Sequence, residues 1–125
     1  MLNYLPEQST DTDRRDSVFH ALADPSRRAM IERLCRGPAS VSELASPLKM
    51  SLPAVVQHLH VLEDSGLVSS QKRGRVRTCS VQPAALMSAE RWISERRTSW
   101  EQSLDRLGEY LAKTDEDKPQ KRSSP

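Results

Sequence analysis

The sequence predicts a mainly α-helical domain that carries one small β-hairpin. Apolar residues recur at helical spacing through most of the chain, the spacing changes to that of short strands over residues 67–82, and helical spacing then returns. With 125 residues, 36% of them hydrophobic, the chain can build one modest core and no second domain. We expect residues 13–112 to form this domain, between a flexible N-terminus (1–12) and a disordered charged tail (113–125).

Short helices with their own start signals make up the first half of the domain. The first is expected over residues 13–22, where Val18, Phe19 and Leu22 are spaced for one helix face. Asp24-Pro25 is typical of an N-cap followed by the first helical residue, and Gly37-Pro38 ends the helix that follows. The inward side of that second helix is expected to hold Ala29, Met30, Leu34 and Cys35.

A pair of helices joined by a few residues comes next. Ser40 and Glu43 form a capping box at the start of a third helix, which we expect Pro47 to limit. Ser51 is the predicted cap of a fourth helix, which runs through LPAVVQHLHVLED and ends at Ser65-Gly66. Two such helices give a helix-turn-helix outline.

The fourth helix has a buried face and an outer face that suits the DNA major groove. Val55, Leu59 and Leu62 form the buried face, beside His58. In a recognition helix Gln57 would hydrogen-bond adenine, and Leu52 or Val56 would pack on a thymine methyl group. A plain surface helix remains the alternative. The predicted DNA-contacting residues of this helix are Ser51, Leu52, Pro53, Val56, Gln57 and His60.

A hairpin directly after the helix-turn-helix predicts a wing, and therefore a winged helix-turn-helix fold. The segments LVSSQK and RVRTCSV have strand character, and Arg73-Gly74 between them indicates a tight turn. The wing, residues 67–82, carries four basic residues within six positions and no acidic residue among them, which suits contacts to phosphates or a narrow minor groove. A solvated turn with basic residues for solubility is the alternative. The four residues are Lys72, Arg73, Arg75 and Arg77.

Charge follows the same division of the chain. The net charge is only +2, but residues 25–82 hold 9 basic and 4 acidic side chains. A basic excess in one region points to a polyanionic partner. Aromatic residues make up 4% of the chain, which argues against stacking platforms for single-stranded nucleic acid. The predicted recognition helix and wing make double-stranded DNA the expected partner.

One long helix, expected over residues 84–112, closes the domain. Its apolar residues recur every seven positions, with further leucines between them, so they form a stripe along one side. This stripe is larger than a domain of this size can cover, which predicts a homodimer; packing within one subunit is the alternative. The predicted dimer residues are Leu86, Ile93, Trp100, Leu104, Leu107 and Leu111.

The sequence lacks the residue patterns that are typical of several other classes of protein. We find no catalytic constellation, no cofactor motif and no ligand spacing for a metal. Cys35 and Cys79 are expected to be structural thiols, although three arginines near Cys79 leave open a lowered pKa and a redox role. No apolar run is long enough for a membrane span and the N-terminal residues lack a secretory pattern, so we expect a cytoplasmic protein.

Three segments together resemble the ArsR-type (arsenic-repressor-like) winged helix-turn-helix regulators over roughly residues 16–82. They are FHALADPSRRAMIERL, SVSELASPLKMSLPAVVQHLHVLEDSGLV and KRGRVRTCSV, and WISERRTSWEQSLDRLGEYL is similar to a metal-independent branch of that family. The resemblance implies a homodimer, a recognition helix that begins at Ser51, a basic wing, and repression of a promoter that an inducing signal relieves.

Two departures from the family pattern change these expectations. Metal-sensing members carry a cysteine pair in the helix that here contains SELASPL, and histidines or acids in the last helix; this chain has no cysteine in the first and no histidine in the second. Metal sensing is therefore not carried over. Leu52, Val56, Gln57 and His60 stand where the family usually has polar or basic residues, which makes DNA binding depend more on the wing.

A winged-helix module for protein–protein contact is the alternative function. In that case the exposed Leu52 and Val56 would face a partner protein instead of DNA. Salt separates the two hypotheses, because binding through several phosphate contacts weakens steeply as salt rises, whereas binding through an apolar surface does not.

Overall fold

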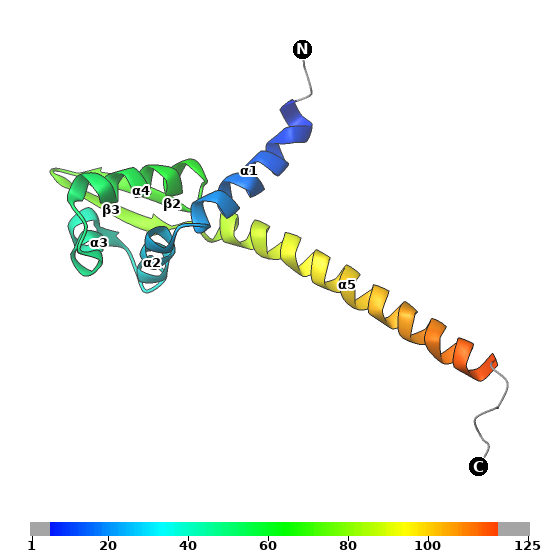
Figure 1. The fold of residues 1–125 in the computed structure, drawn as a ribbon. Coiled ribbons are helices and arrows are strands. Elements are labelled where there is room, and N and C mark those ends of the chain that lie inside the picture. The colour runs from blue at the N-terminus through cyan, green and yellow to red at the C-terminus, as the bar shows by residue number, and fades with distance from the viewer. Residues whose placement is uncertain (1–5, 118–125) are drawn as a thin grey trace. The chain divides into compact units, whose positions relative to one another are not determined.

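The computed structural model describes residues 6–117, and the side chains of residues 12–115. It is mainly helical with one small antiparallel sheet, the winged helix architecture that the sequence predicts (Figure 1). Of the expected flexible N-terminus (1–12) and disordered tail (113–125), residues 1–5 and 118–125 lie outside the described residues, whereas residues 6–12 and 113–117 are helical. The elements in chain order are α1 (Pro6–Leu22), α2 (Pro25–Leu34), β1 (Ala39–Ser40), α3 (Val41–Leu48), α4 (Leu52–Asp64), β2 (Val68–Arg73), β3 (Val76–Val81) and α5 (Pro83–Asp117).

The two terminal helices are longer than the sequence pattern indicated. α1 begins at Pro6 instead of Asp13, and α5 continues to Asp117, past the expected end at residue 112. Both extensions are polar, and hydrophobic periodicity cannot mark the end of a helix that no longer carries an apolar face. The side chains that the structure describes in these extensions, at residues 12 and 113–115, are exposed.

Side chains of the flanking residues cap the helices of the winged fold. Asp24 Oδ2 accepts the backbone N–H of Arg27 at 3.0 Å, and this hydrogen bond lowers the pKa of the carboxyl group. Ser40 and Glu43 form the predicted capping box, and Ser51 caps α4. The expectation that Pro47 ends α3 was wrong, because α3 contains Pro47 and ends one residue later.

Three strands form the sheet in the order β1-β3-β2. The pairing of Arg73 with Val76 leaves Gly74 and Arg75 as the two-residue turn, one position later than expected. Gly74 has φ +61°, the left-handed conformation that such a hairpin turn requires. β1 was not expected; it has two residues, too few to show a sequence period, and it pairs with Thr78 and Cys79 of β3.

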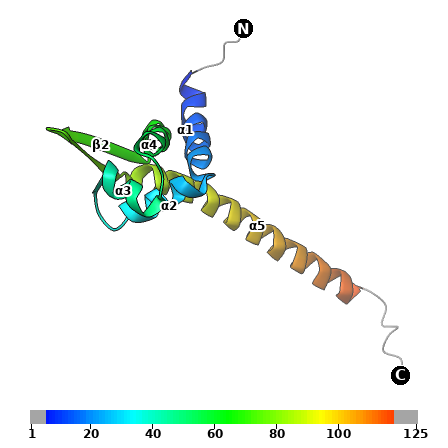
Figure 2. The same ribbon diagram turned by 60° about the vertical axis from the view of Figure 1, so that its left-hand side comes forward.

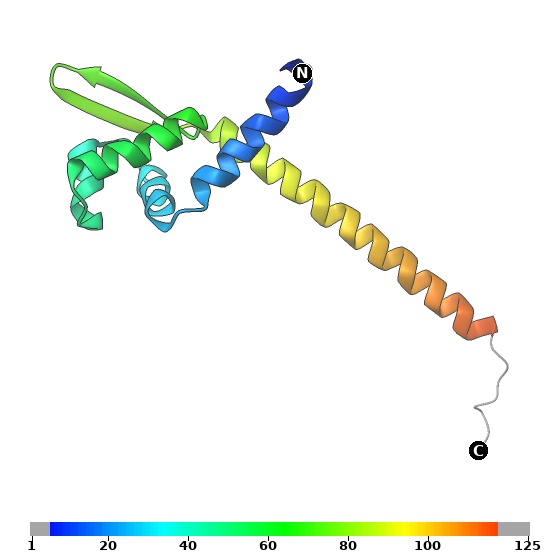
Figure 3. The same cartoon turned by 45° about the horizontal axis from the view of Figure 1, so that its top comes forward.

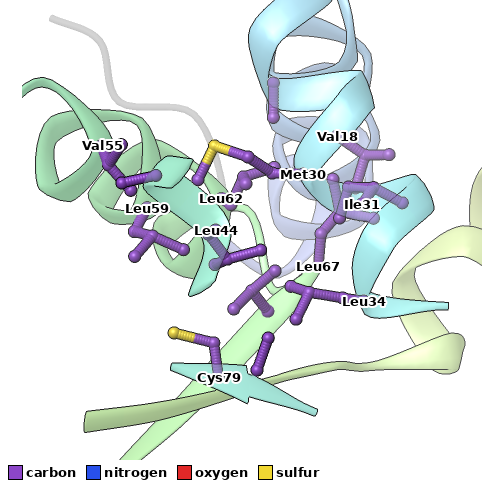
Figure 4. Packing of buried hydrophobic residues seen from close by; sticks show 14 of the residues in the cluster. Val18, Met30, Ile31, Leu34, Leu44, Val55, Leu59, Leu62, Leu67 and Cys79 are labelled. Carbon is purple, nitrogen blue, oxygen red and sulfur yellow. The ribbon is translucent and has the colours of Figure 1, made fainter. Parts of the chain in front are cut away.

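A single apolar core joins the helices to the sheet. Figure 4 shows Leu44 of α3, Leu59 of α4 and Cys79 of β3 pointing into one cluster. Met30 and Leu34 supply the α2 side as predicted, whereas Ile31 is buried without having been expected and Ala29 is only partly buried. Cys35 differs from the expectation and is exposed, because α2 ends at Leu34 and Cys35 is its C-cap.

The chain divides into two compact units between Ala89 and Glu90. The first unit contains the winged fold and the first turns of α5, and the second contains the remainder of that helix. Among the described residues, no helix has the length and hydropathy needed to cross a membrane.

Candidate nucleic-acid interface

The N-terminal half of α4 presents the predicted recognition surface. Ser51 Oγ accepts the backbone N–H of Ala54 at 3.3 Å and fixes where the helix starts. Val55, Leu59 and Leu62 are fully buried, so the rotation of the helix about its axis is fixed as well. The opposite side is therefore turned outward: Ser51, Leu52, Pro53, Gln57 and His60 are exposed, and Val56 is partly buried.

A polar cluster anchors the middle of α4 to α1 and α2. The Arg27 guanidinium donates through Nε to the carbonyl of Ala21 (2.7 Å) and through Nη2 to that of His20 (3.1 Å). Its Nη1 lies 3.3 Å from His58 Nδ1, and Asp24 Oδ2 lies 3.9 Å from the same nitrogen. Arg27 thus binds two carbonyl groups in the last turn of α1 and contacts His58 in the middle of α4. Sequence reasoning missed this cluster, because His58 is separated from Arg27 by 31 positions.

Basic side chains surround the tip of the hairpin. Lys72, Arg73 and Arg75 are exposed, and every residue from 71 to 76 is exposed with them. The closed end of the hairpin extends beyond α3 and α4 (Figures 2 and 3). No acidic residue lies within this segment, so its positive charge is available to a polyanion.

Arg77 differs from these three cations because it is paired within the chain, and its predicted contact with DNA stays a prediction. Its Nη2 lies 2.8 Å from Glu63 Oε1 and 2.7 Å from Oε2, and its Nε donates to Ser70 Oγ at 2.9 Å. Both charged side chains are partly buried. The positive charge of Arg77 is therefore matched by a carboxylate of the same chain, whereas Lys72, Arg73 and Arg75 are exposed.

Cys79 does not have the environment of a reactive thiol. Its side chain is buried in the core, and burial raises the pKa of the thiol despite the opposing effect of the nearby Arg77. The alternative of a lowered thiol pKa was wrong, because burial of the sulfur outweighs the lowering by Arg77 and Glu63 also raises the pKa.

Five of the six predicted dimer residues lie exposed along α5. Trp100 is 64% exposed, and Leu104, Leu107 and Leu111 follow it at intervals of four, three and four residues, all about half exposed. This spacing aligns them along one side of the helix. Leu86 differs, because it packs against the core of the winged fold. Ile93 completes the exposed five.

Within the part of the chain that the structure describes, no three histidine, cysteine, aspartate or glutamate side chains gather closely enough to hold a metal ion. The pattern of exposed groups is instead that of a DNA-binding domain: a capped helix with an outward face, and a basic hairpin next to it in the chain. A winged helix-turn-helix DNA-binding protein is thus the class that fold and surface define.

Comparison with known proteins identifies the family. Residues 24–70 match the family described as "Bacterial regulatory protein, arsR family". The chain is 39% identical to the HTH-type transcriptional regulator Rv2034 of Mycobacterium tuberculosis, over 75% of this chain and 92% of that protein. It is 26% identical to the transcriptional repressor SdpR of Bacillus subtilis, over 62% of this chain and 87% of that protein.

Solved structures agree with this result. The crystal structure of the ArsR family transcriptional regulator RHA00566 is 44% identical, with 81% of this chain and 97% of that chain covered and a TM-score of 0.69. The homodimeric winged helix-turn-helix DNA-binding domain of Mb0332 from Mycobacterium bovis shares the fold at 21% identity, with a TM-score of 0.59 and coverage of 85% and 95%. The chain belongs to the arsR family, and it is a DNA-binding transcriptional regulator and not an enzyme.

Proposed function

We propose that this regulator is a homodimeric repressor that reads double-stranded DNA with α4 and holds the backbone with the tip of its hairpin. The observation that carries the proposal is the pair of outward surfaces on one compact unit: the exposed N-terminal half of α4 and the exposed cations at residues 72–75. A helix of this kind enters the major groove with its N-terminal residues on base edges, and basic hairpin tips reach the flanking phosphates.

Within α4, Gln57 is the residue whose chemistry best suits base recognition. Its amide offers a donor and an acceptor side by side, the pattern that adenine presents in the major groove. Leu52 is 49% exposed, and it would contact a thymine methyl group in the same groove. Lys72, Arg73 and Arg75 would supply affinity with little sequence information.

Two further parts of the proposal, repression and dimerisation, are supported by the relatives and by α5 instead of by α4 and the hairpin. SdpR is named a repressor, and the Mb0332 domain is described as homodimeric. In this chain the exposed stripe from Ile93 to Leu111 would bury its apolar surface against a second copy, which also gives the two-fold symmetry that paired DNA half-sites need. We place the protein in the cytoplasm, where bacterial DNA is accessible to it.

A protein-binding module is the second candidate. Leu52 and Val76 are both about half exposed, so the wing and α4 also offer apolar surface to a protein partner. This candidate predicts binding that is nearly independent of salt, whereas each phosphate contact of the proposed interface contributes about one unit to the salt slope.

The proposal is tested by selecting duplexes from a random pool with the wild-type protein and measuring affinity across a salt series. Gln57→Ala should weaken the selected duplex by roughly 1–3 kcal/mol and leave random DNA nearly unchanged, because a bidentate base contact is lost. Arg75→Ala should weaken both duplexes alike and lower the salt slope by about one unit.

An exposed residue of the second unit provides the control, and Gln102→Ala on α5 should leave both affinities unchanged. Failure to enrich any duplex would remove the proposal. If Gln57→Ala and Arg75→Ala reduced both affinities in the same way, α4 would not be reading sequence.

A further inference from the structure

We propose that Glu63, Ser70 and Arg77 form a clamp that fixes the hairpin to the recognition helix, so that these three residues position the wing on DNA without contacting it. The inference rests on the proposed function, in which α4 and the hairpin tip bind one duplex together. It assigns Arg77 a positioning role in place of the phosphate contact that its sequence position indicated.

The clamp joins three elements. Glu63 lies in the last turn of α4, Ser70 on β2 and Arg77 on β3. The Arg77 guanidinium holds both carboxylate oxygens of Glu63, at 2.7 and 2.8 Å, and also donates to Ser70 Oγ. Ser70 Oγ in turn donates to Glu63 Oε2, so the three side chains form a closed triangle. Charge-assisted hydrogen bonds of this type are the stronger ones in proteins.

Burial separates this ion pair from an ordinary surface pair. The side chains of Arg77 and Glu63 are 32% and 20% exposed, and Ser70 is partly buried. Water and salt therefore screen the pair less than they screen two fully exposed charges. Ser70 is also the register partner of Cys79, a buried core residue, so the triangle stands directly beside the core.

The position of the clamp along the hairpin explains why the wing needs it. β1 pairs with β3 only at Thr78 and Cys79. From Arg77 to the turn the hairpin is a two-stranded ribbon, and residues 71–76 are all exposed. An isolated two-stranded ribbon is only marginally ordered in water. Arg77 is the first residue of β3 beyond the part that pairs with β1. Its bonds to α4 direct the ribbon that carries Lys72, Arg73 and Arg75.

Substitution of Glu63 distinguishes a positioning role of the clamp from a purely electrostatic effect on DNA binding. The Glu63 carboxylate pairs with Arg77, one of the four basic residues of the hairpin. If charge alone mattered, Glu63→Gln would strengthen DNA binding, because it removes a negative charge and frees Arg77 for phosphate. The clamp predicts that Glu63→Gln weakens DNA binding, because a mobile hairpin tip loses more conformational entropy when it binds DNA.

The experiment compares the full-length wild-type protein, Glu63→Gln, Arg77→Lys and the control Glu32→Gln, an exposed acid on α2. Thermal unfolding first verifies that each variant is folded. Affinity is then measured for the duplex selected by the wild type and for a random duplex, and ¹⁵N relaxation reports the order of the backbone amides of residues 72–76. We expect Glu63→Gln to weaken the selected duplex roughly three- to tenfold with lower tip order parameters, and Glu32→Gln to change neither.

Arg77→Lys keeps the charge but cannot make the forked bonds, and it should lose affinity for the selected duplex together with tip order. The clamp is overturned if Glu63→Gln binds the selected duplex as tightly as the wild type or more tightly, or if Arg77→Lys retains full affinity. Loss of the proposed function has a different signature, since the wild type would then select no duplex, or Arg75→Ala would bind normally.

Discussion

Arg73 and Arg77 lie on facing strands of one hairpin, yet the structure gives them different environments. Arg73 is exposed near the turn, whereas Arg77 is held by a carboxylate that lies 14 positions earlier in the chain. From the sequence the two were equivalent, since both belong to a basic cluster without a nearby acid. The contact that separates them is non-local, and no spacing rule predicts it.

The two cysteines give a residue-scale prediction. Cys35 is exposed, whereas Cys79 is buried and burial raises its thiol pKa, so little thiolate forms there near neutral pH. In the folded protein a thiol reagent such as DTNB should modify Cys35 rapidly and Cys79 only after denaturation. Cys35→Ser should abolish the rapid phase, and Cys79→Ser should leave it intact. Rapid modification of Cys79 in the native state would contradict the assignment.

At the scale of helices and strands, local signals were sufficient wherever the cause of an element lies within a few residues. Ser40, Ser51 and Asp24 cap their helices as predicted, because an N-cap bond spans only two or three positions. β1 and the bonds from Arg27 to His20, Ala21 and His58 were not predicted, because each depends on tertiary packing. The outward side of α4 was predictable because the buried residues on its other side recur at helical spacing within the helix itself.

The capping box of α3 gives a prediction about pH. The backbone N–H of Ser40 donates to Glu43 Oε1 at 2.8 Å, and this bond holds the pKa of the Glu43 carboxyl below its ordinary value. A carboxyl with a lowered folded-state pKa contributes stability above its unfolded-state pKa, and this contribution is lost as the pH falls through the folded-state value. Glu43→Gln should therefore lower the free energy of unfolding at neutral pH and match the wild type in acid.

Urea unfolding of both proteins across a pH series measures this difference, with Glu32→Gln as the control outside any capping box. The free energy of unfolding of Glu43→Gln is compared with that of the wild type at each pH. If this difference grew as the pH fell, the carboxylate would not be the stabilising form. Ser40→Ala should cost about 1 kcal/mol at neutral pH, because its hydroxyl accepts the Glu43 backbone N–H at 3.1 Å. This cost should become smaller in acid, because the Ser40 side chain also helps to lower the pKa of Glu43.

At the scale of the whole regulator, the signal that relieves repression is expected not to be a metal ion. Helix α3, where the family resemblance places the cysteine pair of metal sensors, contains no cysteine, and α5 contains no histidine. Zinc, cadmium and arsenite should each change the affinity for the selected duplex by less than about twofold, well below the 5- to 150-fold change that is typical of allosteric coupling. Release of DNA by one equivalent of any of these ions would show a site that this surface does not reveal.

Dimerisation is the property on which the use of two DNA half-sites depends, and α5 carries the surface proposed for it. Trp100, Leu104, Leu107 and Leu111 are each about half exposed or more and share one side of the helix. Apolar side chains repeating at intervals of four and three are typical of helices that pair along a seam. Ile93 extends the stripe by two turns toward the N-terminus of α5.

Charges placed in this seam should therefore separate the two copies. Trp100→Glu combined with Leu107→Glu would put four carboxylates into a dimer interface, where each loses water without gaining a partner, and we expect monomers in analytical ultracentrifugation. Thr98→Glu with Gln102→Glu adds the same charge to the opposite side of α5 and should remain dimeric. The monomeric variant should keep the helical circular dichroism of the winged fold but bind the selected duplex far more weakly, because each half-site is then bound independently. If the Trp100/Leu107 variant sedimented as a dimer, the copies would be joined by another surface.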